Sequence, residues 1–260
     1  MAAVKIGGKY GYIDKKGEVV IKPMFDYGGD FSEGLADVEV DGKHGFIDKS
    51  GDFVIKPKYS MAYGFDEGLT FVVLNSDKGG FIDKTGNFVI KPIYKGAWNF
   101  TEGLAAVRTK VWHVYTAENN YGFIDKSGRL VIDHRFMMAW WFEEGLALVT
   151  EFIEGNWGYI DKTGRYVIRP QFDHAFGFSE GLAGVEKGGK WGLIDKKGRF
   201  MVKPKYEKVR TFSEGLCEFE TNGKKGFLDK TGRVVIKPIF DYVYSFCDGL
   251  SCVEINDKYG

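Results

Sequence analysis

Neither sign of charge is in excess in this chain, because 36 lysines and arginines balance 36 aspartates and glutamates over its 260 residues. No net field therefore attracts nucleic acid or an anionic membrane, and no basic stripe is present, so we expect neither as a partner. No run of 18 apolar residues predicts a membrane-spanning helix. The first six residues also lack the charged and apolar regions of a signal peptide, which favours a cytoplasmic location.

Motifs typical of enzymes and metal sites are absent as well. The sequence has no Walker loop, no G-x-S-x-G, no C-x-x-C and no H-E-x-x-H. Its four histidines do not form a pair at ligand spacing. We therefore expect a protein that is not an enzyme and that needs no metal or cofactor.

Two short motifs recur along the whole chain. Glu-Gly-Leu is one of them, and it becomes Asp248-Gly249-Leu250 in its last copy. The other is a glycine followed by an apolar residue, isoleucine or leucine, and aspartate; its copies begin near Gly11, Gly45, Gly80, Gly122, Gly158, Gly192 and Gly226. The period of roughly 34 residues indicates stacked units that cannot bury their apolar faces alone. Since no linker interrupts them, we predict one repeat domain over residues 1–260, with a truncated eighth unit at Tyr259.

Each unit is predicted to form a short antiparallel meander of four strands. In the last complete unit these strands are expected at 206–212, 216–220, 225–228 and 234–236. Asn222-Gly223 favours a two-residue hairpin, and the run from Asp229 to Gly232 fits a type I turn. Pro238 is expected to end the fourth strand, because proline cannot donate to the ladder. No helix competes, since glycine or proline interrupts every segment.

Continuous apolar runs such as Val19-Val20-Ile21 replace the alternation of a one-sided sheet. They indicate that neighbouring units cover both faces of each sheet. The three cysteines, Cys217, Cys247 and Cys252, lie where other units carry small residues, so we expect small core side chains in a reducing compartment, with a disulfide between the last two as the alternative.

The repeated acidic residues invite a catalytic or metal-ring interpretation, but their positions favour a structural one. The aspartate of each Asp-Lys-x-Gly occupies the first position of a turn. The glutamate of Glu-Gly-Leu recurs in nearly every unit, so we expect it to accept hydrogen bonds from backbone N–H groups. A residue needed once for chemistry would not be needed seven times.

Two copies carry a family resemblance most clearly. They are Trp157-Gly158-Tyr159-Ile160-Asp161 and Trp191-Gly192-Leu193-Ile194-Asp195, the second with Phe-Ser-Glu-Gly-Leu-Ala upstream. Together they resemble the bacterial WG repeat, also written KWG, over essentially the whole chain. The resemblance implies a tandem array and provides no catalytic or binding residues. Other copies depart from it by placing tyrosine, His44, Gly79 or Lys225 before the glycine.

Seven four-stranded meanders predict an all-β fold resembling a β-propeller ring. An open β-solenoid or superhelical array is the alternative, because the segments 3–6 and 251–255 would compete for one place in a closed seven-unit ring. An open array would leave end strands able to pair with another copy of the chain.

The repeat is least regular in its third and fourth units. The longest connection, 107–120, predicts an extended hairpin, and the next unit replaces Lys-Pro by 133–135. Insertions in such arrays map to one face, often the binding face, and Trp, Tyr and Arg are enriched in interfaces. The candidate partner-binding residues are Arg108, Trp112, His113, Tyr115, His134, Arg135, Trp140 and Trp141. The alternative is a hairpin folded back on its own unit, with the two adjacent tryptophans in the core.

We therefore expect a non-catalytic scaffold that binds another protein, with Trp112 and Tyr115 as anchors and Arg108, His134 and Arg135 as polar rim. A carbohydrate-binding module is the main alternative, because 16% of the residues are aromatic and such rings stack on sugars. A propeller-type enzyme is the third; it would need polar residues that occur once, whereas the polar residues here are repeated.

Overall fold

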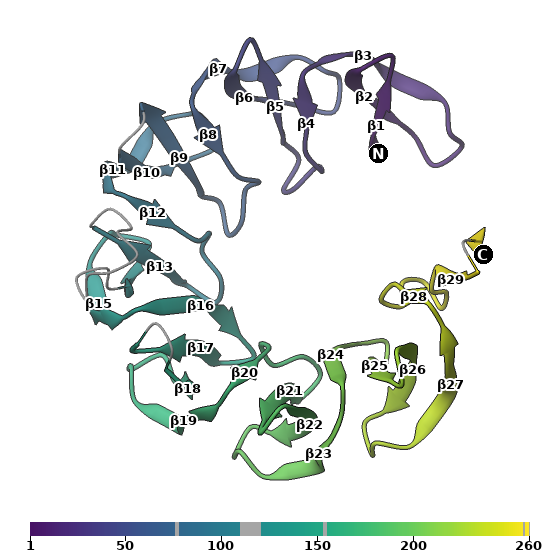
Figure 1. Ribbon diagram of the computed structural model, residues 1–260. Helices are drawn as coiled ribbons and strands as arrows, with labels where there is room; N and C mark the ends of the chain where they lie inside the picture. Colours follow the sequence, from purple (N-terminus) through teal and green to yellow (C-terminus); the bar gives the residue numbers. More distant parts are fainter. Residues whose placement is uncertain (76–77, 110–120, 153–154, 257, 260) are drawn as a thin grey trace. The chain divides into compact units, whose positions relative to one another are not determined.

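The computed structural model describes residues 1–75, 78–109, 121–152, 155–256 and 258–259. These residues form strands and turns without any helix (Figure 1). The chain divides into two compact units, Met1–Arg135 and Phe136–Gly260, and each is described by itself.

Unit 1 is a succession of antiparallel sheets whose strand order follows the chain. The first sheet contains β1 (Ala2–Ile6), β2 (Lys9–Ile13) and β3 (Val19–Phe25). The second contains β4 (Tyr27–Gly28), β5 (Ala36–Val40), β6 (Lys43–Ile47) and β7 (Phe53–Tyr59). The third contains β8 (Met61–Ala62), β9 (Thr70–Asn75), β10 (Lys78–Ile82) and β11 (Phe88–Tyr94). The fourth contains β12 (Gly96–Ala97), β13 (Leu104–Arg108), β14 (Tyr121–Asp125) and β15 (Leu130–Phe136), which reaches the boundary of the unit.

Unit 2 continues the same pattern. Its sheets are β16 (Met138–Glu143), β17 (Leu146–Thr150), β18 (Trp157–Ile160) and β19 (Tyr166–Phe172); then β20 (His174–Ala175), β21 (Leu182–Lys187), β22 (Lys190–Asp195) and β23 (Phe200–Tyr206). They are followed by β24 (Lys208–Ser213), β25 (Leu216–Thr221), β26 (Lys224–Asp229) and β27 (Val234–Phe240), and by β28 (Tyr242–Val243), β29 (Val253–Ile255) and β30 (Lys258–Tyr259). The prediction of antiparallel four-stranded meanders is confirmed.

We had expected the proline to end the fourth strand of the meander, and this prediction is wrong: β27 runs through Pro238 to Phe240. In the second sheet β7 runs through Pro57, and its register with β6 shifts between the pairs His44–Tyr59 and Phe46–Ile55. Three residues of β7 therefore arch over Gly45. A Cβ at that position would lie 2.6 Å from the carbonyl oxygen of Ile55. The bulge accommodates the proline, which needs no ladder partner there, and it explains the repeated glycine by close backbone approach.

The core lies between neighbouring sheets. Phe46 and Tyr59 of the second sheet are fully buried together with Phe65 and Ile82 of the third. The rings of Phe46 and Phe65 have centroids 4.9 Å apart. Each meander thus buries its apolar face against the next one, as the stacked repeat predicted.

The expectation that apolar runs are covered on both faces is wrong. Val19 and Val20 remain 48% and 51% exposed, whereas Ile21 is 5% exposed. Phe53 and Val54 repeat the pattern, with Ile55 buried. These residues begin the last strand of each sheet, which is an edge strand. Because adjacent side chains point to opposite faces of a strand, both faces are open to solvent at its start, and only the isoleucine that follows packs into the core.

The cysteine prediction holds for one residue of three. Cys217 is buried, and burial raises the pKa of its thiol to about 12. Cys247 and Cys252 are free and exposed, which contradicts a core role for both and the alternative of a disulfide between them.

The two segments expected to compete for one place each have their own partner. The strand β1 pairs with β2 in unit 1, and β29 pairs with β28 and β30 in unit 2. The ring and the open array both remain predictions, and so does the single domain over residues 1–260.

Candidate functional site

The glutamate of Glu-Gly-Leu adopts a backbone conformation that few residues favour. Glu33 has φ 50° and Gly34 has φ 92°, and Ser32 and Leu35 exchange both backbone hydrogen bonds across this tight turn. Asparagine or glycine suits such a left-handed position better than glutamate. The free-energy cost of this left-handed backbone conformation is therefore offset by the bonds that the glutamate side chain makes.

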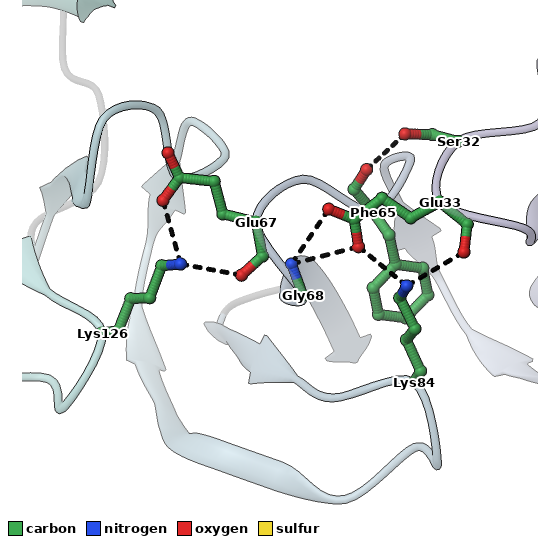
Figure 2. A network of polar contacts seen from close by, with 7 residues as sticks. All are labelled: Ser32, Glu33, Phe65, Glu67, Gly68, Lys84 and Lys126. Atoms are coloured by element: carbon green, nitrogen blue, oxygen red, sulfur yellow. Dashed lines mark hydrogen bonds and ion pairs between the residues drawn. The ribbon is translucent and has the colours of Figure 1, made fainter.

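That side chain holds the next sheet in place (Figure 2). The carboxylate of Glu33 accepts a hydrogen bond from the Gly68 N–H at 3.1 Å and pairs with the Lys84 ammonium at 3.0 Å. The ammonium also donates to the Glu33 carbonyl at 2.9 Å, and Ser32 donates its hydroxyl proton to the carbonyl oxygen of Phe65. The lysine hydrogen bond is the main reason that the pKa of Glu33 lies below its usual value. The same clamp recurs at Glu67, Glu144 and Glu180.

The repeated aspartates are turn residues, as predicted. Asp125 accepts hydrogen bonds from the backbone N–H groups of Ser127 and Arg129 at 3.0 and 3.1 Å, and from the Ser127 hydroxyl at 2.6 Å. These bonds, the hydroxyl first, lower the pKa of Asp125 to about 2. Both families of acidic residues are thus occupied in holding turns and sheets.

The predicted partner-binding residues fall into three groups. Trp112, His113 and Tyr115 lie outside the described residues. Arg108, His134 and Arg135 belong to unit 1, and Trp140 and Trp141 belong to unit 2. Trp140 and Trp141 contact each other and line one pocket.

The unit 1 candidates are not a uniform exposed rim. Arg108 is half-buried, with its guanidinium carbon 5.9 Å from the centre of the Tyr121 ring. His134 on β15 is also half-buried, and burial lowers its pKa from the usual value. Arg135 is exposed.

The two tryptophans lie at the surface of unit 2. Trp140 is 38% exposed and meets the half-buried ring of Trp141 edge to face, with centroids 5.2 Å apart. The indole N–H of Trp141 donates to a carboxylate oxygen of Glu143 at 2.8 Å. Since neither tryptophan is among the buried core residues, the alternative that places them in the core is wrong.

These residues line a pocket of about 180 Å³ within unit 2. Its lining residues come from three successive sheets: from β16 and β17, from β20 and the segment after it, and from β24. The lining residues are Trp140, Trp141, Glu143, Leu148, Ala175, Phe176, Gly177 and Thr211. The sequence interpretation had missed the contribution of the later sheets.

The pocket exists because one sheet departs from the repeat at two positions. Other units carry a small or polar residue just before the phenylalanine of their first turn, whereas this one carries Trp141. The residue after that phenylalanine, Ser32 in the second sheet, is here Glu143. Gly177 provides the room, because a Cβ there would lie 1.8 Å from a carboxylate oxygen of Glu143. Alignment of the units would have revealed both replacements.

The described residues contain no group of three or more His, Cys, Asp or Glu side chains suited to a metal ion. Over the same residues we find no helix with the length and apolar character needed to cross a bilayer.

The fold defines an all-β tandem-repeat protein. The model of the WG containing repeat matches residues 10–43, 45–76, 80–110, 121–151, 157–191, 191–224 and 226–259. The chain therefore belongs to the WG containing repeat family. No curated protein matches it.

Several solved structures, propeller-like ones among them, share this fold. The crystal structure of the eukaryotic initiation factor matches with a TM-score of 0.65 and 13% identity, over 96% of this chain and 78% of that one. BamB from Moraxella catarrhalis matches with a TM-score of 0.56 and 11% identity, over 100% of this chain and 92% of that one. The computationally designed Ika8 protein matches with a TM-score of 0.55 and 12% identity, over 86% of this chain and 78% of that one. At these identities the similarity concerns the fold alone.

Proposed function

We propose that this protein is a non-catalytic repeat scaffold that binds another protein through the irregular surface of its fourth repeat, at the pocket within unit 2. The observation that carries the proposal is the exposed Trp140, which lines the unit 2 pocket and packs edge to face against Trp141. A large ring that is already held in place loses little entropy on binding and offers a large contact area.

The other acidic side chains of the repeat give indirect support. Glu33 and Asp125 represent two repeated families whose carboxylates hold turns and bind the next sheet, which supports a structural role for both. The pocket instead combines aromatic walls with few polar groups, which is the composition of an interface anchor site.

The test is binding to a purified partner, first captured from native lysate and identified by mass spectrometry. Replacing Trp140→Ala should weaken binding about tenfold, which corresponds to more than about 1 kcal/mol for an anchor residue. Tyr244→Ala is the matched control, because Tyr244 holds the same repeat position in unit 2 and is 52% exposed. It should leave the affinity unchanged.

Equal affinities for both variants would place binding elsewhere. A melting temperature that falls with Trp140→Ala in step with the affinity would show a structural role instead. A glycan array examines the carbohydrate alternative, which would gain support if oligosaccharides bound and Trp140→Ala abolished the signal.

A further inference from the structure

The unit 2 pocket has the chemistry of a site for an organic cation. Three of its lining residues are aromatic, Trp140, Trp141 and Phe176, and Leu148 and Ala175 add apolar surface. Aromatic faces attract cations through their quadrupole, and tryptophan does so most strongly. The pocket therefore offers a positively charged group more than apolar area alone.

One carboxylate adds to this attraction. Glu143 lines the pocket, and within the part of the chain that the structure describes no lysine or arginine pairs with it. Its hydrogen-bond donor is the neutral indole N–H of Trp141. Arg210, the neighbour of the lining residue Thr211, is engaged with Glu218 at 3.2 Å. The negative charge of Glu143 is thus left without a compensating cation of its own sheet or of the wall beside it.

The arrangement is also held in place before any ligand binds. Trp141 is fixed to Glu143 by its hydrogen bond, and the backbone at Phe176 accepts a hydrogen bond from the buried Tyr159 hydroxyl at 2.7 Å. Gly177 lets the carboxylate sit against the backbone, since any larger residue would displace it. Rings and charge that are already ordered bind with a smaller entropic cost.

We infer that this pocket binds a lysine or arginine side chain of the partner protein, with the cation against the tryptophan rings and its charge opposed by Glu143. This inference rests on the proposed function, because it supplies the chemistry of the residue that the scaffold would recognise. Lysine and arginine share the required charge, and separate probes distinguish them.

The experiment follows the six tryptophan indole N–H signals of the whole protein by NMR. The probes are the amides of Nα-acetyl-arginine, of Nα-acetyl-lysine and of the neutral Nα-acetyl-citrulline, which copies the shape of arginine. The signals of Trp140 and Trp141 are assigned from their phenylalanine variants. We expect at least one cationic probe to shift both signals saturably, and citrulline to bind about tenfold more weakly or not at all.

Glu143→Gln is the decisive variant, because glutamine keeps an acceptor for Trp141 and removes only the charge. It should weaken the cationic probe about tenfold. The control Glu186→Gln removes a carboxylate that lies on β21 outside this pocket, and should have no effect. Trp140→Leu offers a second variant that removes the ring and keeps the charge.

Equal binding of citrulline and arginine, unchanged binding to Glu143→Gln, or no binding of either cation would overturn the inference. Partner binding that still depends on Trp140 would then leave the proposed function standing with a different ligand chemistry. Loss of that dependence would remove the proposed function as well, so the two failures are distinguishable.

Discussion

Ser32 follows the phenylalanine of the turn after β4, and Glu143 holds the same place after the phenylalanine of β16. In the second sheet the serine hydroxyl donates to the backbone of the next sheet, at Phe65. In the sheet β16–β19 the longer carboxylate turns to Trp141 and contributes to a pocket. The same position of the repeat thus binds the next sheet in one case and lines a pocket in the other.

The comparison shows how one unit of a tandem array can form a pocket that the other units lack the residues for. The turns and clamps are repeated, so a single unit can lose a bond such as that of Ser32 and still be held by its glutamate clamp. Glu144 in the irregular sheet keeps its bonds to Gly181 and Lys196. Two adjacent residues therefore have separate roles: Glu144 binds the next sheet, and Glu143 lines the pocket.

The largest expected effect tests what the two sheets have in common. Gly45→Ala should lower the free energy of unfolding by about 3 kcal/mol, because the new Cβ would meet backbone atoms at 2.6 Å that cannot move independently of the bulge. Gly64→Ala is the matched control, since its nearest neighbour is a side-chain carbon at 3.6 Å. Chemical denaturation measures both. A Gly45→Ala variant as stable as the control would contradict the role of the glycine in close backbone approach.

The next prediction compares the backbone strain at Glu33 with the stabilisation from its side-chain bonds. Glu33→Asn relieves the left-handed backbone strain but cannot reach Gly68 and Lys84. We expect a net loss of about 1 kcal/mol in unfolding free energy, reduced from the value for buried charged bonds because Lys84 is 44% exposed. Lys84→Met should show a smaller loss by the same measurement. Increased stability of Glu33→Asn would mean that the clamp contributes less than the strain costs.

A third change would make the irregular sheet regular. The double variant Trp141→Gly, Glu143→Ser restores the residue types of the other sheets, so we expect its melting temperature to change little. The pocket should be lost, and with it the binding of the arginine probe and of the partner. Thermal melting followed by the NMR titration measures both. Retained binding would show that the two replacements do not create the site.

The smallest expected effect concerns the turns that all sheets share. Because the pKa of Asp125 is lowered to about 2 from a usual 3.8, its contribution to stability is present above pH 3.8 and is lost as the pH falls toward 2. Carboxyl chemical shifts measured by NMR against pH report this value directly. Asp125→Asn should flatten the acid limb of the stability curve slightly, whereas a pKa near 3.8 would contradict the hydrogen bonds described for the turn.

Several features could be predicted from the sequence because they are local and repeated. Asp229 and Gly232 specify their turn by short-range geometry, and Asn222-Gly223 connects β25 and β26 as predicted. The structural role of the acidic residues followed from their number. Strand ends were harder to predict. A proline ends a strand where its missing N–H would have to bond to the neighbouring strand, but the bulge in β27 leaves Pro238 without such a partner, so the strand continues.

The sequence by itself determined the period, the meander and the turns, since each depends on residues within one unit. Only the tertiary structure decided which apolar residues are buried, as the contrast between Val20 and Ile21 shows. It also decided that Trp140 and Trp141 face a pocket with Phe176 and Glu143. Burial and pockets arise between neighbouring sheets, and the side chains that meet there are set by how consecutive sheets pack, which no single repeat encodes.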